Sequence, residues 1–243
     1  MGGGAAHRLA GAAPTGGPAA PGRGPARRAQ REPARGLRPP RRRRAADRTG
    51  ALRVDSDYYR PVPPRPKRFE VLAVGVDRGR DFDSLVAAAE RLPHRRFDIV
   101  TTPARRPSRA LPANVVLHDP VPVDRHRDNL RDAELVVVTS HDLAYPTGQS
   151  VLLEASGCGT CTAVTASAAM TGYIRDGETS FALPLHDPAG IAAVLEAVLS
   201  DDGKRAEVAR AGRERVLAGL NARRMWAGVR AVLRDAVRER GRA

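Results

Sequence analysis

A glycine followed by three residues of a new helix, and then by a carboxylate, is the clearest chemical signal in this chain. Gly148 precedes Gln149, Ser150 and Val151, and Glu154 follows. The first amides of a helix have no internal acceptor and lie at the positive end of the helix dipole, so phosphate is a favoured ligand there. A glycine, which has no Cβ, would let a bulky diphosphate approach this backbone.

Glu154 lies one helical turn beyond Ser150, about 6 Å along the axis at ~1.5 Å per residue. Its carboxylate is placed to accept two hydrogen bonds from a ribose diol while the amides of residues 149–151 hold a diphosphate. Taken alone, a Gly-x-Ser-x₃-Glu string is common, and an amphipathic helix with a solvated glutamate is the simpler explanation.

The neighbouring residues predict a strand–turn–helix–strand unit of a parallel α/β sheet. Residues 134–139 form a short β-branched run that is typical of a buried strand. The hydroxyls of Thr147 and Ser150, beside the glycine, mark a turn and a helix N-cap. The helix ends at Gly157 or two residues later, and residues 163–164 belong to the second strand.

Several motifs, taken in their order along the chain, resemble one family. They are Gly148-Gln-Ser-Val-Leu-Leu-Glu-Ala155, the turn Gly157-Cys-Gly-Thr160, the run Met170–Thr179, Leu183-Pro and Asp187-Pro. This set is similar to the C-terminal, donor-binding domain of GT-B glycosyltransferases of the group-1, family-4 type. Upstream, Val54–Pro61 resembles the linker that enters that domain, and Val74–Asp81 resembles its first phosphate-facing loop. The resemblance covers roughly Arg53 to Val237.

The resemblance implies a Rossmann-like domain that binds a nucleotide-diphosphate sugar and transfers the glycosyl group to an acceptor hydroxyl, with no cofactor and no metal. The helix end at 149–151, with Arg80 and Arg78, would stabilise the charge of the leaving diphosphate, and Glu154 would anchor the ribose. The family often has a Glu eight residues before position 154, where this chain has Pro146. A double-carboxylate mechanism therefore cannot be carried over, and no catalytic residue is assigned.

Two arginines follow the first predicted strand, Phe69–Gly75, at the end where open α/β sheets bind ligands. Arg78 and Arg80 can meet phosphate oxygens bidentately, or they form a solvated turn with the neighbouring aspartates. With the resemblance, phosphate contact is favoured for Arg80 over Arg78. The residues predicted to bind the donor are Gly75, Arg78, Arg80, Thr139, Ser140, Gly148, Gln149, Ser150, Val151 and Glu154.

Histidine and cysteine give weaker signals. His141 follows the predicted donor contacts at 139–140, and it either touches sugar or phosphate or is a solvated loop residue. The six histidines show no metal-binding spacing. Cys158 and Cys161 form a C-x-x-C, but at the C-terminal end of a helix, where the dipole does not lower a thiol pKa. We therefore expect no redox function.

The rest of the pattern alternates strand and helix, which predicts a parallel sheet with helices on both faces. A helix capped by Asp83 or Ser84 comes first. Further elements are expected at 97–100, 114–117, 119–133, 169–175, 181–183, from Asp187-Pro188, at 202–217 and at 222–238. The apolar side of the last helix carries Trp226, Val229, Val232, Leu233 and Val237. Packing of this side on its own domain is favoured over docking to another lobe.

Positive charge is concentrated at the start of the 243-residue chain. Residues 1–67 hold 16 of the 41 Lys and Arg but only 4 of the 27 Asp and Glu. Residues 1–52 consist mainly of Gly, Ala, Pro and Arg, and are predicted to be disordered ahead of a domain at 53–243. The Arg41–Arg44 run suggests nucleic acid or an anionic membrane, but no aromatic residue is interleaved with it, so sequence-specific nucleic-acid binding is not expected.

The chain has neither an apolar signal-peptide region nor an apolar run of membrane-spanning length, and a cytoplasmic location is expected. GT-B enzymes have two lobes, and this chain resembles only the donor lobe. Three hypotheses follow: a half-enzyme that is inactive alone or completed by a partner, a non-catalytic nucleotide-sugar binding module, or a basic-tailed interaction protein that retains only the fold. The acceptor would be a glycan, a lipid or a small molecule.

Overall fold

A computed structural model of the chain describes residues 52–240. The chain divides into two units, residues 1–43 and 44–243, and the described residues all belong to the second. The segment predicted to be disordered, 1–52, therefore lies outside the described residues except for Leu52.

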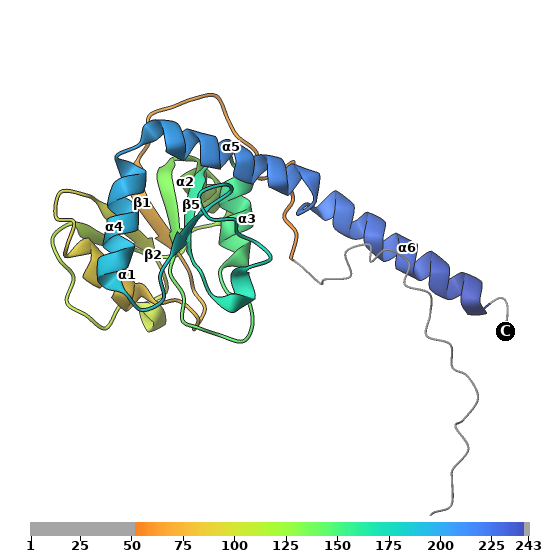
Figure 1. Ribbon diagram of the computed structural model, residues 1–243, viewed down its shortest axis with the longest axis horizontal. Coiled ribbons are helices and arrows are strands. Elements are labelled where there is room, and N and C mark those ends of the chain that lie inside the picture. Colours follow the sequence, from red (N-terminus) through yellow and green to blue (C-terminus); the bar gives the residue numbers. More distant parts are fainter. Residues whose placement is uncertain (1–51, 241–243) are drawn as a thin grey trace, which may run out of the picture. The chain divides into compact units, whose positions relative to one another are not determined.

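Six parallel strands form a single sheet in the second unit (Figure 1). In spatial order they are β3 (Val115–His118), β2 (Phe97–Val100), β1 (Phe69–Val74), β4 (Ala133–Val138), β5 (Cys161–Thr165) and β6 (Phe181–Leu183). The order 3-2-1-4-5-6 is that of the doubly wound Rossmann fold, in which the direction of winding reverses between β1 and β4. The α/β, Rossmann-like fold predicted from the sequence is confirmed.

Helices cover both faces of the sheet, as the pattern predicts. Alternate residues of β1 point to opposite sides, so that Val71 and Ala73 join one core cluster while Leu72 joins the other. The first cluster contains α1 (Phe82–Ala89) and α4 (Pro188–Leu199). The second contains α2 (Val123–Arg131) and α3 (Gln149–Gly157). Helix α5 (Asp202–Ala218) contributes Val208 to the first cluster and Val216 to the second.

Aspartates set the starts of three helices. Asp187 accepts from the amide of Gly190 at 3.0 Å, with Pro188 at the first helical position, as expected for α4. Asp201 caps α5 in the same way. The predicted cap of α1 at Asp83 or Ser84 is wrong, because Asp81 is the cap and the amide of Ser84 is its donor.

The short segment after β5 also differs from the prediction. Instead of a helix over 169–175, only a 3₁₀ turn, η2 (Ala168–Met170), forms. The amide of Tyr173 donates to Met170 at 2.8 Å, and the chain then turns at Gly177, whose φ is +66°. A second 3₁₀ turn, η1 (Pro103–Arg105), lies between β2 and β3. The other elements match their predicted positions to within a few residues.

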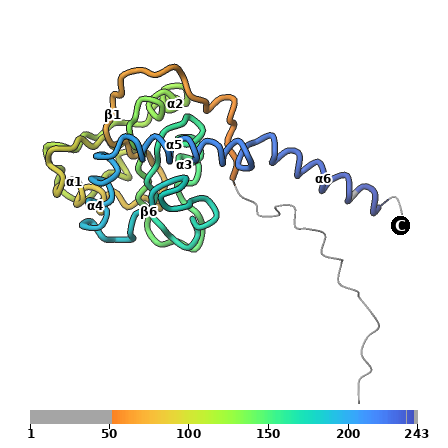
Figure 2. Tube along the Cα trace, turned by 45° about the horizontal axis from the view of Figure 1, so that its top comes forward, coloured from red at the N-terminus to blue at the C-terminus, as the bar shows by residue number. Residues whose placement is uncertain are grey.

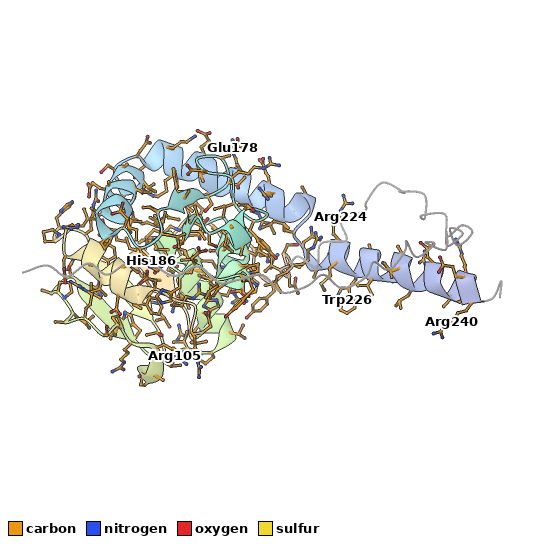
Figure 3. The ribbon with its side chains drawn as sticks, turned by 60° about the horizontal axis from the view of Figure 1, so that its bottom comes forward. Arg105, Glu178, His186, Arg224, Trp226 and Arg240 are labelled. Atoms are coloured by element: carbon orange, nitrogen blue, oxygen red, sulfur yellow. The ribbon has the colours of Figure 1, made fainter. Side chains whose placement is uncertain are left out.

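The last helix, α6 (Ala222–Arg240), does not pack on its own domain, so that prediction is wrong. Trp226 is 58% exposed and Val237 71% exposed, and the other apolar side chains on this side are also exposed. Figure 2 shows α6 continuing beyond α5, and Figure 3 shows Trp226 and Arg240 along it. No described helix has the length and apolar character needed to cross a bilayer.

Candidate functional site

The loops that leave β1 and β4 meet at the carboxyl edge of the sheet, where the winding reverses. Arg80 and Ser140 form an isolated antiparallel bridge. The amide of Asp81 donates to Thr139 at 3.2 Å, and the amide of His141 donates to Gly79 at 2.9 Å. These bonds bring the two predicted groups of donor-binding residues together, in the position of the ligand-binding crevice of folds with this winding.

Arg80 is the buried cation of this crevice. Its side chain is only 5% exposed, and its Nε lies 3.2 Å from Asp77 Oδ2. Neither Nε nor Nη1 has a hydrogen-bond partner among the described residues. Burial lowers the pKa of Arg80, an effect that Asp77 partly offsets. A buried guanidinium with unsatisfied N–H groups is costly, so this side chain is suited to an incoming anion.

Two glycines make room for this guanidinium. A Cβ at Gly75 or at Gly148 would overlap the side chain of Arg80, and Gly148 also has a φ of +80°, which favours glycine. The sequence predicts that Gly148 opens the backbone to a diphosphate. The structure adds that the space beside this glycine admits the cation that a diphosphate would meet.

Asp77 holds the loop in shape. Its Oδ1 accepts from the amide of Gly79 and from Thr147 Oγ1, each at 2.8 Å. Burial raises the pKa of Asp77, but Arg80 and these hydrogen bonds outweigh it and leave the pKa below its ordinary value. The prediction that the hydroxyls of Thr147 and Ser150 help to cap α3 is wrong, because Gly148 is the N-cap and no side chain caps the helix; the Thr147 hydroxyl donates to Asp77 instead.

Helix α3 supplies backbone donors beside the arginine. Its N-cap is Gly148, with no side-chain cap, and the amide of Leu152 is the first to bond back, to Gly148 at 3.0 Å. The amides of residues 149–151 therefore have no acceptor within the helix. Ser150 is exposed and Gln149 half-buried, whereas the Val151 side chain is buried. Because a cation beside a helix N-terminus is unfavourable, the guanidinium near Gly148 and this helix end together favour an anion between them.

Glu154, on α3, contacts α2. Its Oε2 is 2.9 Å from Nε2 of His126, on α2, and both side chains are mostly buried. Burial is the main cause that raises the pKa of the nearby Tyr59 hydroxyl, and the negative charge of Glu154 is the second. No contact among the described residues joins Glu154 to Arg80. The role of Glu154 as a ribose anchor stays a prediction.

The remaining predicted residues divide into buried and exposed. The side-chain oxygens of Thr139 and Ser140 are buried and have no hydrogen-bond partner among the described residues. The backbones of these two residues pair with the β1 loop. Arg78 is exposed. The sequence preference for Arg80 over Arg78 thus agrees with which of the two lies in the crevice, although phosphate contact itself stays a prediction.

The cysteines lie outside this site. Both are buried as free thiols. Burial raises the pKa of Cys158 to about 11 and of Cys161 to about 12, which disfavours the reactive thiolate.

Comparison with known proteins decides the family. The family model described as glycosyl transferase-like matches residues 80–230. The chain belongs to this family. Within it, the chain is 34% identical over 143 residues to the D-inositol 3-phosphate glycosyltransferase of Xylanimonas cellulosilytica, an alignment that covers 54% of this chain and 34% of that protein. The chain therefore spans about a third of the length of this relative.

Solved structures of glycosyltransferases share the fold. The C-terminal domain of a group 1 glycosyl transferase, LpcC from Francisella tularensis, aligns with a TM-score of 0.58 at 17% identity and covers 70% of this chain and 99% of that domain. HepE of Anabaena, in complex with UDP-glucose, gives a TM-score of 0.62 at 14% identity, covering 74% of this chain and 55% of that protein. The predicted resemblance to the C-terminal domain of GT-B glycosyltransferases is confirmed.

Proposed function

We propose that this domain binds the diphosphate of a nucleotide sugar between Arg80 and the N-terminus of α3, as the donor-binding half of a glycosyltransferase. The observation that carries the proposal is the nearly buried Arg80 side chain, two of whose nitrogens have no hydrogen-bond partner among the described residues. A diphosphate oxygen would satisfy these N–H groups, and the amides of residues 149–151 would meet the same anion.

This arrangement addresses the step in which the glycosyl group leaves its diphosphate. As the bond between the sugar and the diphosphate breaks, negative charge grows on the leaving oxygens. A fixed guanidinium and fixed amides stabilise that charge without reorganising, and we propose that they do so with no cofactor. The acceptor hydroxyl would come from a glycan, a lipid or a small molecule held by a second lobe or partner chain, because this chain resembles the donor lobe only.

Support for a nucleotide sugar comes from the family and from one structural neighbour. The HepE structure contains UDP-glucose, which makes UDP-glucose the first donor to test. We propose Glu154 as the ribose anchor. For this role its carboxylate would have to accept from the ribose diol as well as bond to His126. A cytoplasmic location, which the sequence suggests, is part of the proposal.

Calorimetric titration of the full chain with UDP, GDP and UDP-glucose tests the proposal. We expect saturable binding of at least one of these ligands. No saturable heat with any of them would remove both the half-enzyme and the nucleotide-sugar binding module, and leave an interaction protein that retains the fold.

Two variants separate a ribose contact from a packing role for Glu154. Glu154→Gln should weaken nucleotide binding, since a neutral amide is a poorer acceptor for a diol. His126→Gln removes the imidazole from the same carboxylate but leaves the carboxylate free to bind ribose, so affinity should be kept. If both variants lower affinity equally, Glu154 acts by holding α2 against α3. If Glu154→Gln changes nothing, the carboxylate is not the anchor.

A further inference from the structure

Two histidines and a buried carboxylate from three distant parts of the chain meet beside the β1 and β4 loops. Asp81 ends the loop after β1, His141 lies after β4, and His186 lies between β6 and α4. One ligand atom of each, a ring nitrogen or a carboxylate oxygen, lies within 4.8 Å of the other two. The two imidazole rings are stacked, with their centroids 5.5 Å apart.

The carboxylate of this cluster is held firmly in place. Asp81 Oδ1 accepts from the amide of Ser84 at 3.0 Å, and Oδ2 accepts from Ser84 Oγ at 2.6 Å. Oδ2 also lies 2.9 Å from Nδ1 of His186. The Asp81 side chain is 6% exposed. The hydroxyl and the amide of Ser84 hold its carboxylate in one orientation.

The histidines are accessible and their backbones are constrained. The His186 side chain is 54% exposed, and His141 is also exposed. His186 has a φ of +50° and is the one described non-glycine residue in the left-handed region, which side chains rarely adopt. The amide of His141 is fixed by its bond to Gly79. A solvent ion can therefore reach two imidazoles backed by one carboxylate.

We propose that Asp81, His141 and His186 form a binding site for a divalent transition-metal ion, with Zn²⁺ as the representative ion. Two imidazole nitrogens and one carboxylate oxygen suit Zn²⁺, whereas Mg²⁺ and Ca²⁺ prefer all-oxygen sites. Binding needs the three ligand atoms to close to about 2.0–2.2 Å from the ion, with small rotations of the exposed imidazoles. The remaining coordination positions face solvent and stay open to water or an anion.

This site is independent of the proposed glycosyl transfer, which uses no metal. It adjoins the anion crevice through the backbone, because Asp81 follows Arg80 and His141 follows Ser140. The sequence shows no metal-binding spacing, because Asp81 and His141 are 60 positions apart and His141 and His186 are 45 apart. Only the strand order brings the three residues together.

Metal binding to the full chain, freed of metal, tests the site without any assay of activity. In competition with a chromogenic chelator we expect one equivalent of Zn²⁺ to bind at this site. His141→Ala and His186→Ala should each weaken its binding by about tenfold or more, because each removes one of three protein ligands. Co²⁺ in place of Zn²⁺ should give a visible d–d absorption band that His186→Ala abolishes.

His94→Ala is the matched control. His94 is another exposed histidine, with its Nε2 3.0 Å from a carboxylate oxygen of Glu196, but it is not part of the cluster. The His94→Ala variant should have the Zn²⁺ affinity and the Co²⁺ spectrum of the parent chain. Far-UV circular dichroism checks that the variants fold. If the parent chain binds no Zn²⁺, or if His141→Ala and His186→Ala bind it as tightly as His94→Ala does, the proposal is wrong.

Discussion

At the scale of single residues, we propose that Arg80 lowers the stability of the domain and raises its affinity for an anion. Its guanidinium is nearly buried against two glycines, and its ion-pair partner, Asp77, is 47% exposed. The folded domain therefore bears a desolvation cost that an anion would offset. An apolar side chain of similar length would avoid this cost, and would leave Asp77 with solvent as well as its two hydrogen-bond donors.

Arg80→Met should therefore separate folding from binding. We expect the free energy of unfolding in urea to be unchanged or higher. UDP affinity should fall by about tenfold to a hundredfold, because the variant loses a charge-assisted hydrogen bond that contributes about 1.5–3 kcal/mol. Arg210→Met, at a position of α5 that is 67% exposed and outside this loop, should alter neither quantity by much. A loss of stability in Arg80→Met without loss of affinity would assign Arg80 a purely structural role.

Gly148 offers a second test at this scale. Gly148→Ala should lower the free energy of unfolding by at least about 1 kcal/mol, because alanine is strained at a φ of +80° and its Cβ would overlap Arg80 and Val138. Gly228→Ala is the control. A Cβ at Gly228, within α6, would meet no other atom within 4 Å, so this variant should be neutral or slightly stabilising. Urea titrations of both variants check this. Equal stability of the two would mean that the left-handed turn is not needed.

The sequence predicts residue types better than residue partners. The family resemblance favours Arg80 over Arg78, and Arg80 is the one that lies in the crevice. The pairing of Thr147 with Asp77 escapes sequence reasoning, because two residues 70 positions apart meet only once β1 and β4 are neighbours. The same reason hides the bond between His126 and Glu154, which depends on how α2 packs on α3.

At the scale of elements, apolar patterning fixes most of the fold. The strands at 69–74 and 133–138 are apolar except for one glutamate each, and both are central in the sheet. The pattern misleads at α6, because an apolar stripe shows that a helix has a face to cover and does not show what covers it. A short segment such as 168–170 is also poorly predicted, because local turns compete with helix there.

An ion-pair network joins α4 to the amino ends of β1 and β2. Arg95 Nη2 lies 2.8 Å from Glu196 Oε1, and Nη1 lies 2.9 Å from Glu70 Oε1. The hydrogen bond from Arg95 is the main cause that lowers the pKa of Glu196 to about 2, from an ordinary value of 4.5. A lowered carboxylate pKa adds stability that is complete above pH 4.5 and is lost as the pH falls toward 2.

Glu196→Gln should therefore flatten the pH dependence of stability in this acid range. The parent should lose more free energy of unfolding than the variant between pH 5 and pH 2, measured by urea titration at each pH. Glu178→Gln is the control, because that carboxylate is 70% exposed and lies 3.9 Å from its partner, Arg175. Parallel pH profiles for the parent and Glu196→Gln would show that the network adds no stability.

At the scale of the whole molecule, a single domain supplies every described residue of the proposed donor site. The β1 loop, the β4 loop and α3 all come from this domain, so donor binding as proposed would need no second lobe. The alignment spans about a third of the length of the Xylanimonas relative, and α6 leaves an apolar side exposed. We therefore expect binding and turnover to be separable in this chain.

The purified chain should bind UDP-glucose saturably and yet release glucose from it no faster than the Arg80→Met variant does. The described residues resemble only the donor lobe, and we propose that a second lobe orients the acceptor hydroxyl and excludes water at the anomeric carbon. The assay is UDP release over time, with and without candidate partner chains. The single tryptophan of the chain, Trp226, is 58% exposed, so its fluorescence should shift to shorter wavelength when a partner covers α6. Transfer of glucose to an acceptor by the chain alone would contradict the half-enzyme, because one lobe would then suffice.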